Sequence, residues 1–175
     1  MSQPSVSVVI PAYNARSTIE RALQSVARQS LNATEVIVID DASTDDTITI
    51  VSEFSSTSKI AIRILHSDQN AGPGSARNRG WDNSTGEFIA FLDADDVWHP
   101  QKLEIQVREM RRNRSFVMSC HERIVSASHM FPGIDETKVL TRELSLNDFI
   151  IKNRCSTPTV MVRKTVNERY KNEKR

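Results

Sequence analysis

The sequence has only two cysteines, Cys120 and Cys155, among its 175 residues. They lie far apart, with no Cys-x-x-Cys pair and no histidine cluster near them, so neither a zinc site nor a disulfide framework is indicated. We expect reduced thiols, as in a cytoplasmic protein. The chain also lacks the apolar run of roughly 18 to 20 residues needed to cross a bilayer, and its N-terminus lacks the pattern of a signal peptide. These absences predict a cytoplasmic protein that is neither secreted nor membrane-spanning.

An excess of one charge sign is missing as well, because 23 lysines and arginines stand against 22 aspartates and glutamates. Nucleic acid is therefore not the expected partner. Arg111, Arg112, Arg114 and the basic C-terminal tail leave peripheral association with the inner face of the plasma membrane as an alternative. We favour a solvated charged face for these residues. Nothing in the sequence indicates an oligomeric state.

Short apolar runs and helical periods account for most of the first two thirds of the chain. The apolar runs are rich in β-branched residues and predict strands that are mostly buried on both faces. The predicted strands cover residues 6–10, 36–39, 60–65 and 88–92. A helix is expected over 19–26 behind a capping box at 17–20, a second from Ser43, a third over 75–83, and a fourth with Pro100 at its first position.

Strands that alternate with helices predict a parallel sheet covered on both faces. Residues 1–115 are therefore expected to form a doubly wound, Rossmann-like α/β unit, within one domain over residues 1–175. The pattern weakens beyond Phe116. We expect a strand over 116–125, a short helix over 145–152, a strand over 159–162, and either the start of a helix or a truncation point in 164–175.

Ligands of an open parallel sheet bind outside the carboxyl ends of its strands, so we expect the residues that follow each strand to form the site. Pro11, Tyr13 and Asn14 follow the first strand, and the tyrosine ring is suited to stacking on a nucleobase. A plain turn explains this motif equally well by itself. Asp41 follows the second strand, where its carboxylate can accept from the imide N–H of uracil while Ser43 caps the next helix.

A glycine-containing turn follows the third strand and leads into the segment with Arg77. Its backbone N–H groups and the arginine can meet a diphosphate, although glycine in a turn has a simpler conformational explanation. Asp93, Asp95 and Asp96 follow the fourth strand. This density of carboxylates suits Mg²⁺ or Mn²⁺ shared with substrate phosphates, and helix capping is the simpler alternative. The four histidines show no ligand spacing and are given no role.

These four motifs, in this order and at this spacing, closely resemble the family 2 glycosyltransferases over residues 5–105. The resemblance implies a GT-A fold, an inverting transfer, and a nucleotide-diphospho-sugar donor held with Mn²⁺ or Mg²⁺. It also implies the site residues. Pro11 and Tyr13 line the base with Asn14 beside them, Asp41 binds the base, Arg77 lies near the phosphates, Asp93 with Ala94 binds the ribose side, and Asp95 is the metal ligand, with Asp93 and Asp96 as weaker candidates.

The resemblance predicts transfer from a nucleotide-sugar, with UDP-sugar favoured, to a hydroxyl of a glycan or lipid-linked acceptor. Asp96 extends the usual Asp-x-Asp and hints at O-antigen, capsule or other surface polysaccharide synthesis. Residues 1–115 would bind the donor, and 116–175 would be an incomplete acceptor-side part. The family's general base is expected beyond Arg175, and the remaining carboxylates in this part do not match its motif: Asp135, Glu136, Glu143 and Asp148.

Two other functions fit parts of the sequence. A nucleotide-sugar-binding fragment or paralogue without catalysis would have the same motifs and lack only the base. A phosphatase of the haloacid-dehalogenase type also places Asp-x-Asp after an apolar strand, with Asp93 as the nucleophile. That phosphatase motif belongs on the first strand of its domain, and it leaves Asn14 and Asp41 unexplained.

Overall fold

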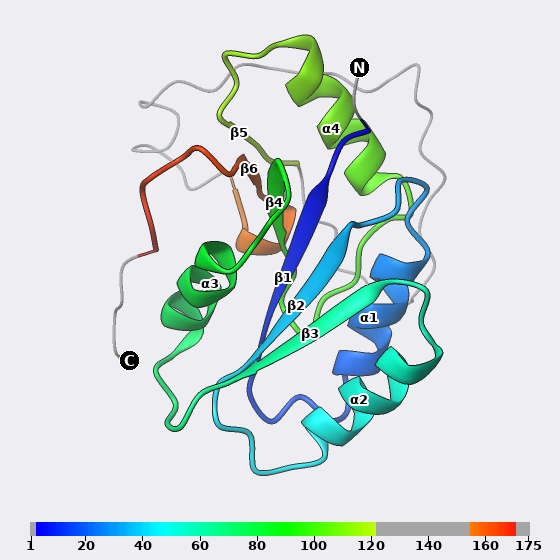
Figure 1. The fold of residues 1–175 in the computed structure, drawn as a ribbon, viewed down its shortest axis with the longest axis vertical. Helices are drawn as coiled ribbons and strands as arrows, with labels where there is room; N and C mark the ends of the chain where they lie inside the picture. The colour runs from blue at the N-terminus through cyan, green and yellow to red at the C-terminus, as the bar shows by residue number, and fades with distance from the viewer. Residues whose placement is uncertain (1–2, 122–154, 171–175) are drawn as a thin grey trace.

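The protein is built on a six-stranded sheet (Figure 1), in a computed structural model that describes residues 3–121 and 155–170. The strand order is β3-β2-β1-β4-β6-β5. The first four strands are parallel: β1 (Val6–Ala12), β2 (Glu35–Asp40), β3 (Ala61–His66) and β4 (Phe88–Phe91). The last two are short and antiparallel to their neighbours: β5 (Met118–Ser119) and β6 (Met161–Arg163).

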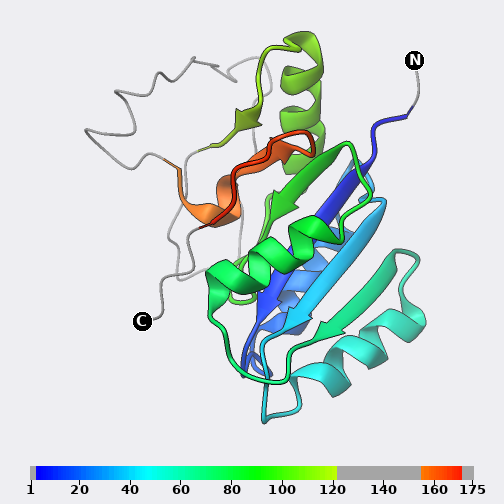
Figure 2. The same cartoon turned by 60° about the vertical axis from the view of Figure 1, so that its left-hand side comes forward.

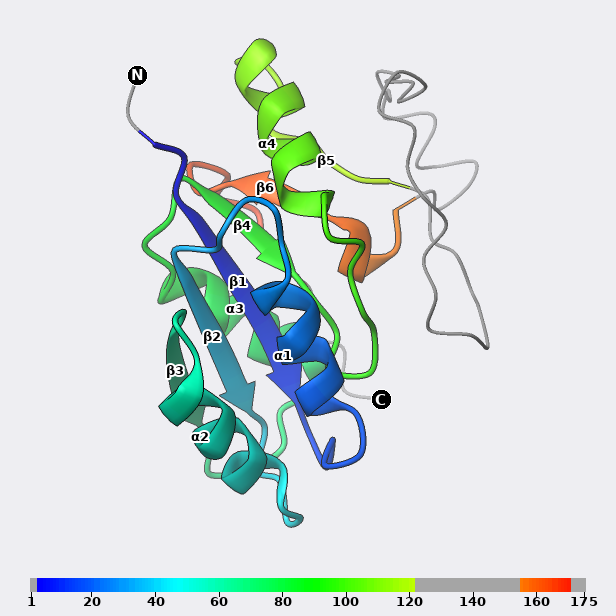
Figure 3. The same ribbon diagram turned by 90° about the vertical axis from the view of Figure 1, so that its right-hand side faces the viewer.

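Helices cover both faces of the sheet, as the alternating sequence pattern predicts. They are α1 (Ile19–Ala27), α2 (Thr47–Thr57), α3 (Pro73–Asp82) and α4 (Lys102–Arg112), with a short 3₁₀ helix, η2 (Thr157–Thr159). Figures 2 and 3 show α3 on one face and α1, α2 and α4 on the other. Strand β1 serves both sides, because Val8 and Ile10 pack in the core under α1 while Val9 packs in the core under α3. The predicted doubly wound α/β architecture is confirmed.

The chain changes direction across the sheet at β1. From β1 it passes through α1 to β2 and through α2 to β3, all on one side, and then returns through α3 to β4 on the other side of β1. The boundary between β1 and β4 is therefore a topological switch point, where the loops at the carboxyl ends of the strands diverge. An open α/β sheet has its binding crevice at this position.

Two predicted helix starts and the predicted capping box are wrong. Helix α2 begins at Thr47 with Asp46 at its N-cap, so Ser43 lies before the helix, where its side chain accepts from the Asn14 backbone N–H (3.0 Å). Helix α4 begins at Lys102, because the residues around Pro100 form a turn in which the Lys102 N–H donates to the His99 carbonyl (3.0 Å). At α1, the Thr18 N-cap makes no side-chain capping bond.

The expected burial of the third strand is also wrong, because β3 is the edge strand of the sheet and its residues are only partly covered. Of the expected strand over 116–125 only Met118–Ser119 forms, and the one over 159–162 forms as Met161–Arg163 after the turn of η2. Residues 164–170 contain a turn and no helix. The helix expected over 145–152 lies outside the described residues.

The two cysteines are joined by a disulfide, which corrects the expectation of reduced thiols. Cys120 follows β5 and Cys155 precedes η2, with their Cα atoms 5.8 Å apart despite a sequence separation of 35. Both half-cystines pack against the core under α3. The spacing in the sequence could not show this proximity, because it arises from the pairing of β5 with β6.

Lys102 gives the stability of the fold an unusual pH dependence. Its side chain is buried over the Trp98 ring (4.3 Å to the ring centre) and donates to Gln106 Oε1. Burial lowers the pKa of Lys102 from 10.5 to about 7. Between these two pKa values the unfolded chain binds more protons than the folded chain, so the free energy of unfolding rises with pH. Below pH 7 the buried amine is charged in the folded protein, and its destabilising effect is then complete.

We expect the free energy of unfolding to increase by about 2 kcal/mol between pH 7 and pH 9. Urea unfolding at several pH values measures this increase. The matched control is Lys102→Met, which has no titrating amine and should lose this part of the pH dependence. Equal slopes for the two proteins would contradict the assignment.

Candidate nucleotide-sugar and metal site

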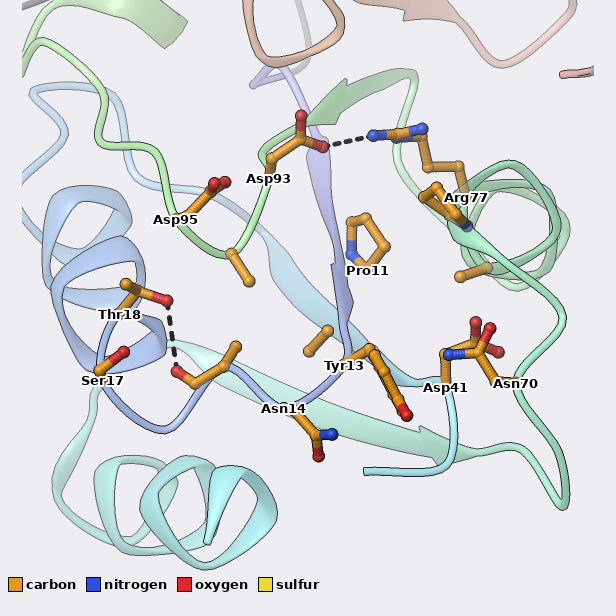
Figure 4. Close-up of a pocket in the computed structure, with 15 residues that line it drawn as sticks. Pro11, Tyr13, Asn14, Ser17, Thr18, Asp41, Asn70, Arg77, Asp93 and Asp95 are labelled. Carbon is orange, nitrogen blue, oxygen red and sulfur yellow. Dashed lines mark hydrogen bonds and ion pairs between the residues drawn. The ribbon is translucent and has the colours of Figure 1, made fainter. Parts of the chain in front are cut away.

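A pocket of about 490 Å³ opens at the carboxyl ends of β1, β2 and β4, beside the first turn of α3 (Figure 4). It lies at the switch point of the sheet. The pocket contains every residue expected to bind the nucleotide-sugar, together with Asp95, whereas Asp96 is not among the lining residues. The lining consists of Pro11, Ala12, Tyr13, Asn14, Ala15, Ser17, Thr18, Asp41, Asn70, Pro73, Ala76, Arg77, Asp93, Ala94 and Asp95.

The loop after β1 presents an aromatic ring to the pocket. Tyr13 is 51% exposed, an unusual position for a large apolar ring, and it lines the pocket close to Pro11. Asn14 next to it has a left-handed backbone (φ 48°). Its side-chain oxygen accepts from the Thr44 backbone N–H (2.8 Å). Asn14 therefore lines the pocket and also joins the loop after β1 to the loop after β2.

Further bonds between the same two loops fix the position of Tyr13. The Ala15 N–H donates to Thr47 Oγ1 (2.8 Å), and the Arg16 N–H donates to Asp45 Oδ2 (3.1 Å). Burial alone would raise the pKa of Asp45, but the hydrogen bonds from Thr47 and Arg16 outweigh it and lower the pKa. The Asp45 carboxylate is thus ionised at neutral pH and holds the two loops together.

Asp41 is a buried carboxylate on the floor of the pocket. It is 4% exposed, and its two oxygens accept from the backbone N–H groups of Ala71 (3.0 Å) and Gly72 (2.8 Å). Gly72 has a left-handed φ of 85°, which lets the loop turn toward Asp41 and start α3. Each carboxylate oxygen retains lone-pair capacity after one bond. Asp41 can therefore still accept from a base N–H while the loop before α3 holds it in place.

Arg77 and Asp93 form an ion pair along one wall of the pocket. Helix α3 carries Arg77 across the end of the sheet to Asp93 after β4, with the guanidinium Nη2 2.6 Å from the carboxylate Oδ1 (Figure 4). The two side chains are 12% and 28% exposed. Because only one end of the guanidinium is used by Asp93, its remaining N–H donors can serve an anionic ligand.

Asp95 stands apart from this ion pair, at the rim of the pocket. Its backbone carbonyl accepts from the Arg21 guanidinium of α1 (2.8 Å), and the turn that carries it is closed by a bond from the Asp96 N–H to the Asp93 carbonyl (3.1 Å). Within residues 3–121 and 155–170, the Asp95 carboxylate itself is exposed and makes no hydrogen bond or ion pair. It is the pocket carboxylate best placed to receive a cation.

The donor set fits a cation that shares its ligands with a substrate. In the described part of the chain, no group of three or more histidine, cysteine, aspartate or glutamate side chains could enclose a metal by itself. Mg²⁺ and Mn²⁺ are commonly held by one or two carboxylates together with phosphate oxygens and water. Asp95 supplies such a carboxylate beside a pocket that can hold a diphosphate.

Two residues that support the site carry no signal in the sequence. Arg21 holds the Asp95 backbone from α1, and Tyr170 lies against the Arg77 guanidinium (5.4 Å from its carbon to the ring centre). They contact residues 74 and 93 positions away, which no local pattern reveals. Among the histidines, His66 lies near Asp40 (3.2 Å) on the exposed edge of the sheet, and none of the described histidines lines the pocket.

The described residues include no helix that is both long and apolar enough to cross a membrane. Two relatives are bacterial glycosyltransferases. The chain is 36% identical over 143 residues to UDP-Glc:alpha-D-GlcNAc-diphosphoundecaprenol beta-1,3-glucosyltransferase WfgD of Escherichia coli, covering 81% of this chain and 55% of the relative. It is 40% identical over 108 residues to the putative teichuronic acid biosynthesis glycosyltransferase TuaG of Bacillus subtilis, covering 62% and 42%.

Solved structures show the same fold. S. aureus TarS 1–349 in complex with UDP superposes with a TM-score of 0.74 at 28% identity, over 91% of this chain and 47% of TarS 1–349. A mannosyltransferase from Pyrobaculum calidifontis in complex with GDP-Man and Mn²⁺ gives a TM-score of 0.65 at 29% identity, over 70% and 37%. The chain thus spans about half the length of these relatives or less.

The sequence model of glycosyl transferase family 2 matches residues 7–171, nearly the whole chain. This match extends beyond the four motifs to the strand β6 and the segment after it. The GT-A fold expected from the resemblance is confirmed by the likeness to TarS. The chain belongs to glycosyl transferase family 2.

Proposed function

We propose that this chain binds the donor of a metal-dependent, inverting glycosyltransferase that moves a sugar from a UDP-sugar to a hydroxyl of a glycan or lipid-linked acceptor. Bacterial surface polysaccharide synthesis is the proposed setting. The names of WfgD and TuaG, which refer to a diphosphoundecaprenol-linked acceptor and to teichuronic acid, support it. The proposal includes donor binding by residues 1–115 and an acceptor side in 116–175.

One observation carries the proposal: an exposed ring, a buried carboxylate, an arginine and an unpaired carboxylate, from four separate chain segments, line a single pocket. Tyr13, Asp41 and Asp95 follow β1, β2 and β4, and Arg77 lies in α3, so the four residues meet through the arrangement of the parallel sheet and its helix. A volume of about 490 Å³ lies within the usual range of small-molecule sites. The ring can stack on a base, the buried carboxylate can accept from the imide of that base, the arginine can bind a phosphate, and the exposed carboxylate can bind a cation.

In the proposed complex, Tyr13 and Pro11 stack on the uracil, and Asp41 accepts its imide N–H. Asp93 accepts from the ribose hydroxyls while it orients Arg77, whose free N–H donors bind the diphosphate. These contacts hold the anomeric carbon in place for attack by the acceptor hydroxyl. The residues act by binding and orientation, and the described part of the chain lines the pocket with no carboxylate besides Asp41, Asp93 and Asp95.

Asp95 would hold Mn²⁺ or Mg²⁺ together with the diphosphate oxygens, with Asp93 and Asp96 as weaker candidates. Bound there, the cation supplies Lewis-acid stabilisation of the negative charge on the departing nucleoside diphosphate. The manganese in the mannosyltransferase complex supports this assignment. Asp135, Glu136, Glu143 and Asp148 lie outside the described residues and are not assigned as the general base.

A binding module without catalysis is the second candidate, because the residues that line the pocket account for donor binding and none of them is assigned as a general base. The chain spans 55% of WfgD and 47% of TarS 1–349. The phosphatase alternative has lost its support, because family membership is established and the Asp93 motif follows β4 instead of β1.

Isothermal titration calorimetry with UDP, GDP and UDP-glucose tests donor binding. We expect UDP to bind in the presence of Mn²⁺ and its dissociation constant to rise at least about tenfold when EDTA replaces the metal, because the diphosphate then lacks its main counter-charge. GDP should bind more weakly if the pocket is shaped for uracil. Nucleotide binding that is indifferent to the metal would overturn the proposal.

Release of UDP from UDP-glucose separates the two candidates. A catalytic chain shows slow metal-dependent donor hydrolysis, whereas a binding module shows Mn²⁺-dependent UDP binding and no release. Hydrolysis of a simple phosphate monoester by the wild type, unaffected by UDP, would instead support the phosphatase.

A further inference from the structure

The segment that follows β6 is attached to α3, the helix that carries Arg77 (Figure 2). The Asn78 side chain clamps the backbone of Tyr170, because its Nδ2 donates to the Tyr170 carbonyl (2.8 Å) and its Oδ1 accepts from the Tyr170 N–H (2.9 Å). Arg169 adds an ion pair with Asp82 (3.0 Å) and lies over the Trp81 ring (4.4 Å). The backbone of residue 170 is therefore fixed beside Arg77.

The Tyr170 ring is held on two sides by other aromatic rings. Its centre lies 5.3 Å from that of Phe91 and 6.5 Å from that of Trp81, in edge-to-face arrangements with interplanar angles of 87° and 70°. Such pairs are the favoured aromatic geometries and restrict rotation of the ring. The ring thus has a fixed orientation when it meets Arg77.

Arg77 lies between this ring and Asp93. Its guanidinium carbon is 5.4 Å from the centre of Tyr170, within the range of a cation–π contact, and its Nη2 is 2.6 Å from Asp93 Oδ1. Within the described residues the buried Arg77 Nε has no hydrogen-bond partner. One end of the guanidinium is therefore held by Asp93, and the Tyr170 ring packs against the group.

The contact uses the neutral ring and not a phenolate. Burial raises the pKa of Tyr170 to about 12; the Arg77 charge lowers it by a smaller amount, and the Asp93 charge adds a still smaller increase. The hydroxyl therefore stays protonated at physiological pH. A phenylalanine at this position should make the same ring contact with the Arg77 guanidinium.

We propose that Tyr170 is a positioning residue for donor binding: it fixes the Arg77 guanidinium so that one end holds Asp93 and the other donors meet the phosphates. This inference rests on the proposed nucleotide-sugar function. A free arginine side chain loses considerable rotamer entropy when it binds an anion, and a preorganised one loses less. The segment after β6 thereby contributes to donor affinity without contacting the donor.

The test is a double-mutant cycle on UDP affinity with Mn²⁺, using the full 175-residue chain. Tyr170→Phe should change the dissociation constant by less than about twofold, and Tyr170→Leu should raise it roughly five- to tenfold. In an Arg77→Ala background, Tyr170→Leu should add less than about twofold, because the residue through which it acts is gone. Equal losses in both backgrounds would mean a merely structural role and would overturn the inference.

A second cycle on urea unfolding keeps the inference testable without a nucleotide. If Tyr170 holds Arg77, the two substitutions should couple by about threefold or more in the unfolding equilibrium constant, and Phe at 170 should retain that coupling. If the wild type binds no UDP, the proposed function fails, and this cycle alone decides whether the ring positions the arginine. If the effects of the Tyr170 and Arg77 substitutions on the free energy of unfolding were additive, the inference would be overturned. This holds even if Tyr170→Leu is strongly destabilised.

Discussion

Replacement of Asp95 by alanine is expected to raise the dissociation constant of UDP in the presence of Mn²⁺ by about 100-fold, or ~2.7 kcal/mol. The Asp95 carboxylate is the exposed member of the aspartate cluster that lines the pocket, whereas Asp93 is already bound to Arg77. Without Asp95 the cation would have only phosphate and water ligands at this position. Calorimetry with and without EDTA measures this loss. For Asp95→Ala, the dissociation constants of UDP under the two conditions should be nearly equal.

Folding should be almost unaffected by this change, because the side chain makes no bond within the described residues and its loop is held through its backbone by Arg21. We expect a free energy of unfolding within about 0.5 kcal/mol of the wild type. Asp68→Ala is the matched control, since it removes an exposed aspartate outside the pocket. Asp96→Ala tests whether Asp96, the weaker candidate, is a metal ligand. Retained metal dependence in Asp95→Ala with its loss in Asp96→Ala would transfer the ligand role to Asp96.

The first four strands, their parallel arrangement and the meeting of the four motifs could be predicted from local sequence. Apolar β-branched runs fix where the strands lie, and a parallel sheet brings the residues after its strands to one edge. Tyr13, Asp41 and Asp95 could therefore be selected before their geometry was known. This part of the prediction depends on short-range patterns and one topological rule.

The starts of α2 and α4 and the supporting contacts could not be predicted, because they depend on partners distant in the sequence. Serine is a common N-cap residue, but the Ser43 hydroxyl accepts from the backbone N–H of Asn14, 29 positions away. Asp41 accepts from the loop at Ala71 and Gly72, and this loop was expected only to meet phosphate. Local propensity gives way wherever such long-range bonds compete for the same atoms.

The edge position of β3 and the disulfide could not be predicted either, because both depend on how distant strands are arranged in the sheet. An apolar run of six residues is compatible with a central or an edge strand, and only the strand order decides which face is covered. Cys120 and Cys155 meet because β5 and β6 pair at the far end of that order. Neither the order of the short strands nor this pairing has a signature in the residues themselves.

Gly80→Ala is expected to lower the free energy of unfolding by about 2 kcal/mol, although alanine is the better helix former by ~1 kcal/mol. Gly80 is buried where α3 crosses β1 and β2. A Cβ atom there would overlap Val9 Cγ1 and lie 3.1 Å from Val9 Cγ2 and 3.3 Å from Ile39 Cγ1. Because Val9 is fully buried and β-branched, its methyl groups cannot rotate away, so α3 must move off the sheet.

The displacement of α3 should also reach the donor pocket, since Arg77 lies three residues before Gly80 on the same helix. Urea unfolding measures the loss of stability, and calorimetry should show roughly tenfold weaker UDP binding. Val9→Ala removes the methyl groups that meet the new Cβ, so Val9→Ala with Gly80→Ala should cost at least about 1 kcal/mol less than the sum of the single changes. Strict additivity would show that the helix accommodates the extra atom elsewhere, and that the close approach of α3 to β1 does not set the position of Arg77.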